Sequence, residues 1–256
     1  MKSPQSFLRG SLVSLLLLTG VHIDGYKPVI IVHGLFDGPK QLKTLSQYIT
    51  KVHRGTEVKV ISLYNNMASL KPMWRQVQAF RKSMESIMQE SPDGVHLLCY
   101  SQGGLICRAL LSTTPHHNVH TFISLSSPQA GQYGDPHQRS RYLQYNTFLP
   151  MINGDRPNKD MKAWRENFLR IKKLVLIGGP DDGVITPWQS SHFGFFDSNE
   201  NILEMRNQEF YKNDTFGLKM LDARGDVSQC VHSGVKHVKW HSNFTVFQSC
   251  MEKWLT

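Results

Sequence analysis

The 256-residue sequence predicts an α/β fold in which a mostly parallel central sheet is flanked by helices. Short apolar runs typical of strands alternate with longer stretches of helical spacing, and this alternation favours a parallel sheet covered by helices. The composition is that of a globular protein, with 40% hydrophobic and 19% charged residues. The length suits one domain with a sizeable core.

Each element is predicted from its own pattern. The run 29–32 is β-branched and suits a central strand buried on both faces. Further strands are predicted at 58–63, 95–100, 122–125 and 174–177. Helical spacing predicts helices at 42–53, 72–89, 103–111 and 245–255, whose apolar, methionine and aromatic stripes are expected to pack in the core. The stretch 128–161 has little periodicity, and we predict no secondary structure there.

The first 24 residues are typical of a signal peptide. Lys2 and Arg9 provide a basic start, a leucine-rich run covers 12–18, and the small pair Thr19-Gly20 ends it. The apolar run is too short to span a bilayer; the alternative is an anchoring helix. We therefore expect residues 1–24 to be removed on export and residues 25–256 to form a single domain.

Export changes how the four cysteines are interpreted. In an oxidising compartment an even number of cysteines favours disulfides over buried free thiols. The economical pairing joins Cys99 to Cys107 and Cys230 to Cys250, because each pair falls within one local unit.

The surface of an exported chain also carries candidate modification sites and charge. Asn213 and Asn243 begin N-x-T sequons and are candidate N-glycosylation sites.

The net charge of +9 falls to +7 without Lys2 and Arg9. The basic residues are scattered and form no nucleic-acid motif, so we expect no nucleic-acid partner, while contact with anionic membranes or acidic substrates is favoured.

The sharpest chemical signal is Tyr100-Ser101-Gln102-Gly103-Gly104. A predicted strand runs into a serine, and small residues follow where a helix begins, which is the pattern of a nucleophile elbow and of the α/β-hydrolase fold. Cys99 stands two residues before the serine, where the usual pattern has glycine. Ser101 is therefore the candidate nucleophile, and the alternative is a surface serine in a strand-to-helix turn.

Two backbone amides are candidates for an oxyanion hole. The N–H of Gln102 lies at the start of the helix, where the helix dipole adds positive potential. The turn that begins His33-Gly34 follows the first strong strand, and such a turn supplies the second donor, here the N–H of Leu35. We expect His33 itself to be structural.

Chain order places the acid and then the base after the nucleophile. Asp182 is the preferred acid, in the loop that follows the strand 174–177; Asp181 is the alternative, and the aspartate that is not the acid is expected to hold the loop by local hydrogen bonds. His237 precedes the tail helix and is the preferred base, ahead of His241 and His232.

These residues predict acyl transfer through an acyl-enzyme. His237 would take the proton of Ser101, and Asp182 would orient the imidazole. No metal or other cofactor is expected, because this chemistry needs none and the histidines show no ligand spacing.

Four segments together resemble the palmitoyl-protein thioesterase family, and most closely its lysosomal branch. The resemblance implies a lysosomal glycoprotein that hydrolyses long-chain acyl thioesters, with palmitoyl-CoA as type substrate. It also implies the triad, the oxyanion donors and both disulfide pairings given above. The segments are Tyr26-Lys27-Pro28-Val29-Ile30-Ile31-Val32-His33-Gly34-Leu35-Phe36-Asp37, Cys99-Tyr100-Ser101-Gln102-Gly103-Gly104-Leu105, Ile123-Ser124-Leu125-Ser126-Ser127-Pro128-Gln129 and Gly178-Gly179-Pro180-Asp181-Asp182-Gly183-Val184-Ile185-Thr186-Pro187-Trp188.

The resemblance breaks after Gly131-Gln132-Tyr133-Gly134-Asp135 and resumes near Met151. The family has a longer segment there, which carries a further cysteine pair, covers the sheet and helps to form the acyl-binding groove; here Pro136 to Pro150 is short and polar. We expect the triad to be unaffected and the groove to be altered.

Two other functions fit the same residues. The elbow chemistry serves a lipase or carboxylesterase on oxygen esters as well as a thioesterase, and a damaged pocket would leave a catalytically impaired lipid-binding isoform. Secretion is the alternative to the lysosome. The sequence does not determine the oligomeric state.

Overall fold

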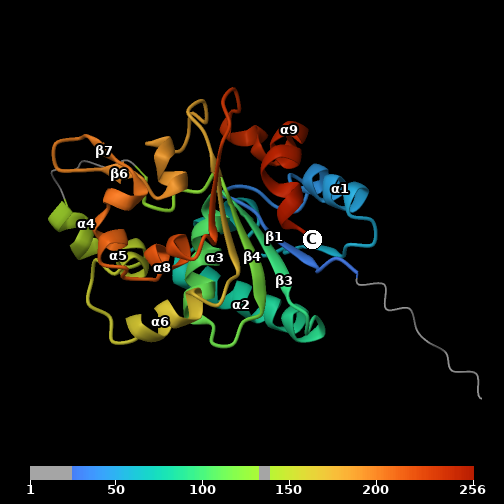
Figure 1. Ribbon diagram of the computed structural model, residues 1–256, viewed down its shortest axis with the longest axis horizontal. Helices are drawn as coiled ribbons and strands as arrows, with labels where there is room; N and C mark the ends of the chain where they lie inside the picture. Colours follow the sequence, from blue (N-terminus) through green and yellow to red (C-terminus); the bar gives the residue numbers. More distant parts are fainter. Residues whose placement is uncertain (1–24, 133–138) are drawn as a thin grey trace, which may run out of the picture.

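The computed structural model describes residues 25–132 and 139–256 (Figure 1). The predicted signal peptide lies outside the described residues. At the centre is a six-stranded sheet with the strand order β2-β1-β3-β4-β5-β8, in which every neighbouring pair is parallel. The strands are β1 (Val29–Val32), β2 (Val58–Val60), β3 (Val95–Tyr100), β4 (Val119–Leu125), β5 (Lys173–Gly178) and β8 (Val227–Val231).

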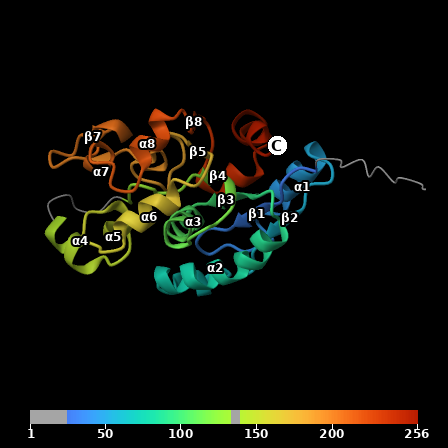
Figure 2. The same ribbon diagram turned by 60° about the horizontal axis from the view of Figure 1, so that its bottom comes forward.

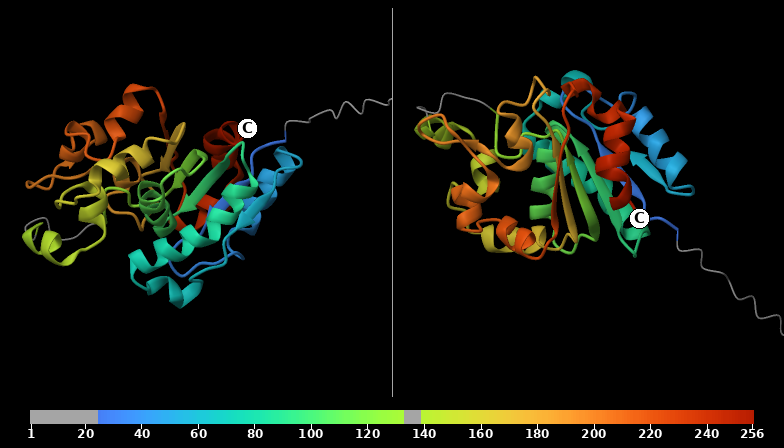
Figure 3. Two further views of the ribbon diagram at one scale, coloured as in Figure 1. Left: turned by 90° about the horizontal axis from the view of Figure 1, so that it is seen from below. Right: turned by 45° about the horizontal axis from the view of Figure 1, so that its top comes forward.

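Helices cover both faces of this sheet, as Figure 2 and the right-hand view of Figure 3 show. One face packs against α2 (Met73–Glu90) and α3 (Gln102–Thr113), and the other packs against α1 (Lys43–Val52) and the C-terminal segment. Because successive side chains of a strand point to opposite faces, Ile30 enters the first layer and Ile31 enters the second. The α/β-hydrolase architecture predicted from the sequence is confirmed.

Most predicted elements form within a few residues of their expected bounds. β1 is buried along its whole length, as expected for a strand covered on both faces. β2 ends at Val60, earlier than predicted, and the chain continues into a 3₁₀ segment, η1 (Asn66–Leu70). The methionine and aromatic stripe of α2 is buried, so its prediction as core is also correct.

Several elements were not predicted, because they are short or polar. β8 is partly exposed at the edge of the sheet and has no continuous apolar run. The stretch without periodicity contains α4 (Arg139–Tyr145), α5 (Leu149–Asn153) and the start of α6 (Met161–Phe168), and the chain later forms the hairpin of β6 (Phe195–Phe196) with β7 (Ile202–Leu203). Further short helices are α7 (Glu209–Lys212) and α8 (Leu218–Ala223).

The predicted tail helix forms, but with changing pitch. It consists of α9 (Phe244–Val246), a π-helical turn (Phe247–Met251) and a 3₁₀ turn (Glu252–Trp254). Its apolar side chains are buried against the same face of the sheet as α1. Among the described residues, none of the helices combines the length and the apolar character needed to cross a membrane.

Both predicted disulfides are present. Cys99 at the end of β3 is bonded to Cys107 in α3, so that a covalent link spans the strand-to-helix turn. Cys230 in β8 is bonded to Cys250 in the tail, which attaches the last helical segment to the edge of the sheet.

Candidate active site

The three candidate triad residues meet at the carboxyl edge of the sheet. Ser101 follows β3, Asp182 follows β5, and His237 begins the 3₁₀ segment η5 (His237–Ser242) after β8. His237 Nε2 is 2.9 Å from Ser101 Oγ, and His237 Nδ1 is 3.0 Å from both carboxylate oxygens of Asp182. All three residues are buried. The geometry therefore matches the nucleophile, base and acid arrangement expected from the sequence.

The turn at Ser101 holds the serine in a backbone conformation that is rare for a residue with a side chain. Its φ is +53° and its ψ is −126°, and its N–H donates to the carbonyl oxygen of Leu125. A Cβ on Gly103 would lie only 2.6 Å from the carbonyl oxygen of His33. Glycine at 103 therefore allows the start of α3 to pass close to the end of β1.

The two amides expected to form an oxyanion hole lie on either side of this turn. Gln102 is the first residue of α3, so its N–H has no acceptor within the helix. Leu35 follows Gly34, where an added Cβ would lie 2.8 Å from Ser101 Cβ. The segment after β1 thus runs directly beside the serine.

Asp182 accepts hydrogen bonds at both of its oxygens. The backbone N–H groups of Val184 and Ile185 donate to Oδ1 over 3.0 and 2.8 Å. Burial of this carboxyl disfavours its charge, but the hydrogen bonds from His237, Ser126 and Ile185 outweigh burial and lower the pKa of Asp182 to about 2. The carboxylate is therefore held ionised beside the imidazole.

Two side chains outside the predicted triad complete the environment of Asp182. The hydroxyl of Ser126 donates to Asp182 Oδ2 over 2.5 Å and lies 3.0 Å from His237 Nδ1. The indole N–H of Trp240 donates to the same oxygen over 2.6 Å. Ser126 follows β4 at the carboxyl edge of the sheet, and this position was the available signal; no motif marks Trp240.

Backbone contacts fix the position of His237. Its N–H donates to the carbonyl oxygen of Asp182 over 2.8 Å, and its own carbonyl accepts from the hydroxyl of Tyr100 over 2.8 Å. Burial and the nearby carboxylates of Asp37 and Asp182 raise the pKa of Tyr100, so it remains a neutral donor. The base is thus anchored through its main chain as well as its ring.

The alternative acid and bases lie outside this arrangement. Asp181 is exposed, and its Oδ2 accepts from the N–H of Gly234 over 2.7 Å. The expectation of local hydrogen bonds for the second aspartate was wrong, because Asp181 links two separate loops while Asp182 makes the local ones. The His241 ring lies against Tyr100, and His232 Nδ1 lies near the carbonyl oxygen of Ser233.

His33 and the two sequon asparagines, Asn213 and Asn243, lie outside the triad. His33 Nε2 is 2.8 Å from the carbonyl oxygen of Leu63, which ties the end of β1 to the segment after β2, as expected for a structural histidine. Asn213 is exposed at the end of α7, while Asn243 is half-buried and its side chain caps α9 by accepting from Val246. Within 25–132 and 139–256, no three His, Cys, Asp or Glu side chains are grouped to hold a metal ion.

Sequence comparison identifies close relatives over most of the chain. A sequence model described as "Palmitoyl protein thioesterase" matches residues 28–139 and 133–237. The chain is 49% identical over 271 residues to "Lysosomal thioesterase PPT2" of Mus musculus, covering 92% of this chain and 90% of that protein. It is 48% identical over 278 residues to the Homo sapiens protein of the same name, and this alignment covers 94% of this chain and 92% of that protein. A "Lysosomal thioesterase PPT2 homolog" of Drosophila melanogaster is 35% identical, and the alignment covers 95% of this chain and 97% of that protein.

Solved structures of other proteins share the fold at low sequence identity. The lin2722 gene product of Listeria innocua has a TM-score of 0.54 at 12% identity, covering 90% of this chain and 93% of the other. Lipase B of Aspergillus fumigatus has a TM-score of 0.51 at 18% identity, and the match covers 80% of this chain and 44% of the lipase chain. At this identity the likeness supports the architecture alone.

Proposed function

Because this chain belongs to the palmitoyl protein thioesterase family, we propose that it is a lysosomal serine thioesterase that hydrolyses long-chain fatty acyl thioesters such as palmitoyl-CoA. The observation that carries the proposal is the position of His237, which lies within hydrogen-bond distance of Ser101 on one side of its ring and of Asp182 on the other. The names of the relatives supply the bond type and the compartment.

The first half of the reaction forms an acyl-enzyme. The Ser101 hydroxyl gives its proton to His237 Nε2 while Oγ attacks the thioester carbonyl. The carbonyl oxygen becomes negative and receives hydrogen bonds from the N–H groups of Leu35 and Gln102. When the tetrahedral intermediate collapses, the carbon–sulfur bond breaks and the leaving thiolate takes the proton from His237.

The second half releases the fatty acid. Water gives a proton to His237 and attacks the acyl carbonyl, and the proton returns to Ser101 as the ester bond breaks. Asp182 keeps the imidazole in the orientation that presents Nε2 to the serine, and its charge stabilises the imidazolium formed in each half. The pKa of about 2 supports this role, because the carboxylate stays ionised in an acidic compartment.

Delivery through the secretory pathway follows from the same proposal. Residues 1–24 would act as the removable signal peptide, and Asn213 and Asn243 would accept glycans. The two disulfides fit an oxidising route of folding, since such bonds rarely persist in the cytosol. Secretion past the lysosome is the alternative destination.

We also propose that the chain lacks a segment that its relatives have near residues 133–139. The family match falls into two stretches that meet there. The alignment with the mouse protein spans 271 positions but takes in 92% of this chain, which is about 236 of the 256 residues, so about 35 positions of the alignment have no counterpart in this chain. Sequencing the transcript across codons 130 to 155 tests whether this shortened form is the expressed one.

The direct test is hydrolysis of palmitoyl-CoA by the purified protein and its Ser101→Ala variant. We expect the variant to lose activity by at least about 10³-fold, because the nucleophile is gone while the fold is kept. Ser249→Ala is the matched control, since this serine lies in the tail and bonds to the carbonyl oxygen of Thr245. Equal activity of the Ser101→Ala variant and the wild-type protein would refute the assignment of the nucleophile.

A second assay separates the thioesterase from its alternatives. An oxygen ester with the same acyl chain is compared with palmitoyl-CoA, and a preference for the oxygen ester would favour a lipase or carboxylesterase. Failure of a fluorophosphonate probe to label Ser101 in folded protein would favour the catalytically impaired lipid-binding isoform.

A further inference from the structure

Exposed apolar side chains surround the candidate active site at the carboxyl edge of the sheet. They lie in the segments that follow β1, β2, β5 and β8, and because all these strands are parallel, the segments share one edge. Each side chain is between 37% and 69% exposed. This apolar rim consists of Leu35, Phe36, Met67, Leu70, Val184 and Val238.

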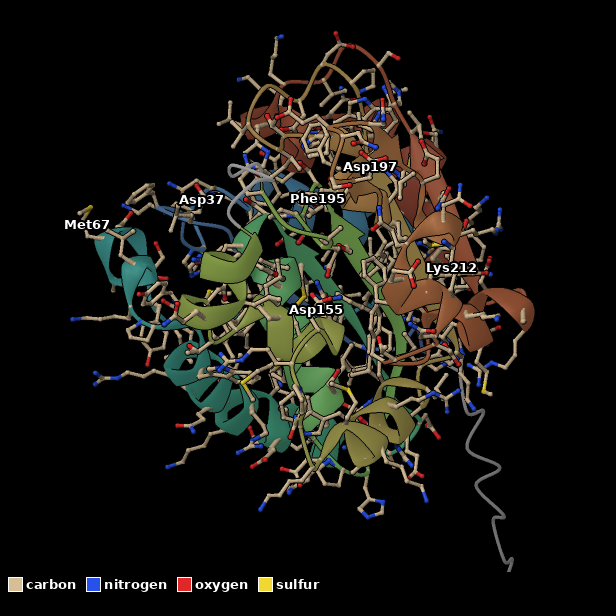
Figure 4. All side chains as sticks on the ribbon, turned by 90° about the vertical axis from the view of Figure 1, so that its left-hand side faces the viewer. Asp37, Met67, Asp155, Phe195, Asp197 and Lys212 are labelled. Carbon is tan, nitrogen blue, oxygen red and sulfur yellow. A yellow bond between two sulfur atoms is a disulfide. The ribbon has the colours of Figure 1, made fainter. Side chains whose placement is uncertain are left out.

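Specific contacts hold parts of the rim together. The N–H of Phe36 donates to Ser69 Oγ over 2.9 Å, and the N–H of Asn66 donates to the carbonyl oxygen of Asp37 over 2.8 Å. The segment after β1 is thereby fixed to η1, which carries Met67 and Leu70. Figure 4 shows Asp37 and Met67 on these adjacent segments, with Met67 projecting outward at the margin of the molecule.

Three of the same four segments carry exposed lysines, and 181–187 carries none. The four segments cover residues 33–41, 62–72, 181–187 and 232–241, and their exposed lysines are Lys40, Lys71, Lys236 and Lys239. They contain three carboxylates, and these face inward or are already bonded. Asp182 is buried in the triad, Asp181 accepts from Gly234, and Asp37 is half-buried near His241 and His237.

We propose that the apolar rim and its four lysines dock on a bilayer that carries anionic lipids. Large exposed apolar side chains bordered by cations are the combination that binds membrane surfaces, because the apolar groups enter the interface while lysines meet negative headgroups. The role of docking rests on the proposed function. The long acyl chain of the substrate partitions into membranes, and its thioester carbonyl must reach Ser101. Docking at this edge places the mouth of the site against the lipid.

The test measures vesicle binding apart from catalysis. Binding of the purified protein to phosphatidylcholine vesicles with and without phosphatidylglycerol is followed by cosedimentation. The rim variant Met67→Ser/Leu70→Ser and the charge variant Lys40→Glu/Lys71→Glu avoid every proposed catalytic group. The matched control is Tyr26→Ser/Met220→Ser, which removes two exposed apolar side chains from before β1 and from α8.

We expect the wild-type protein and the control to bind anionic vesicles, and each test variant to bind at least tenfold more weakly. Hydrolysis of a water-soluble short-chain thioester should be unchanged in both test variants, while hydrolysis of a palmitoyl thioester embedded in vesicles falls with binding. No binding by the wild-type protein, equal binding to neutral vesicles, or equal loss in the control would overturn the proposal. If no thioester is hydrolysed at all, the proposed function fails while the binding result still decides whether the rim docks.

Discussion

The indole N–H of Trp240 donates to Asp182 Oδ2 over 2.6 Å, on the carboxylate that also faces His237. Trp240 has no exposed surface, and Asp182 is only 3% exposed. This hydrogen bond, together with the one from Ser126, reduces the freedom of the carboxylate and takes up part of its charge. Under the proposed mechanism we therefore expect both donors to act on the reaction through Asp182, as positioning residues.

Trp240→Phe removes the indole donor while keeping an aromatic ring. A hydrogen bond to a buried charged group contributes about 1.5–3 kcal/mol, so we expect kcat/KM on a soluble thioester to fall about tenfold or more. Without this donor the carboxylate holds a proton more tightly, so the pKa of Asp182 rises from about 2 and the acid limb of the pH–rate profile shifts to higher pH.

The pH profile distinguishes positioning from a general loss of stability. Tyr100, Asp37 and His241 are titratable groups close to this centre, and the variant leaves them in place. The matched control is Trp254→Phe, a tryptophan near the C-terminus that packs against Lys173. An unshifted acid limb for Trp240→Phe would contradict the positioning role.

Ser126 combines a functional hydroxyl with an unusual backbone, since its φ is +45°. Ser126→Ala keeps this conformation but loses the donor, and we expect the unfolding free energy to fall by about 1–2 kcal/mol. Ser126→Gly loses the same hydroxyl but tolerates positive φ, and should be more stable than the alanine variant by about 0.5–1 kcal/mol. Denaturant unfolding of both variants measures the difference; equal stability would show that the backbone is not strained.

The glycine at 103 is expected to be intolerant of a methyl group. Gly103→Ala would place its Cβ 2.6 Å from the backbone oxygen of His33 and 2.7 Å from that of Val32, at the end of the buried strand β1. We expect a loss of about 1–3 kcal/mol in unfolding free energy, with activity falling because the elbow shifts. Gly38→Ala, whose Cβ would meet Asn65 no closer than 3.4 Å, is the control and should stay close to wild type.

His96 on β3 is expected to make the protein less stable in acid. Burial first, and then repulsion by His120 and Lys27, lowers the pKa of His96 from 6.5 to about 3. The unfolded chain binds a proton below pH 6.5 and the folded chain does not, so stability present above pH 6.5 is lost as the pH falls toward 3. Between pH 7 and pH 5 this one histidine costs about 2 kcal/mol.

His96→Leu tests this expectation. The difference between the unfolding free energies at pH 7 and pH 5 should shrink by about 2 kcal/mol in the variant. His116→Leu is the control, because this histidine is exposed in the loop before β4. A pH dependence that is the same in His96→Leu and the wild-type protein would contradict the prediction.

The strands and the elbow were predictable because their signals are local. Apolar runs mark β1, β3 and β5, which are buried, although His96 interrupts the run of β3. A serine between a strand and glycines marks the turn. Asp182 and His237 were predicted from chain order, and in the structure His237 lies within hydrogen-bond distance of both Ser101 and Asp182.

The remaining contacts depend on tertiary structure and carry no local pattern. Trp240 reaches Asp182 across 58 positions of sequence, and Ser126 reaches it across 56. β8 is an exposed edge strand, so burial does not impose an apolar run on it. α5 and α6 pack against α3, but each is short and leaves few turns for a periodic pattern to show in the sequence.

The position of His237 has a consequence for the newly made chain. The base is 136 positions after the nucleophile, and the tail that follows it covers one face of the sheet. During synthesis the N-terminal part emerges first, so Ser101 is present long before its partner. Under the proposed mechanism, a chain released before residue 237 lacks the base, so we expect it not to hydrolyse an acyl bond even where its earlier strands have paired.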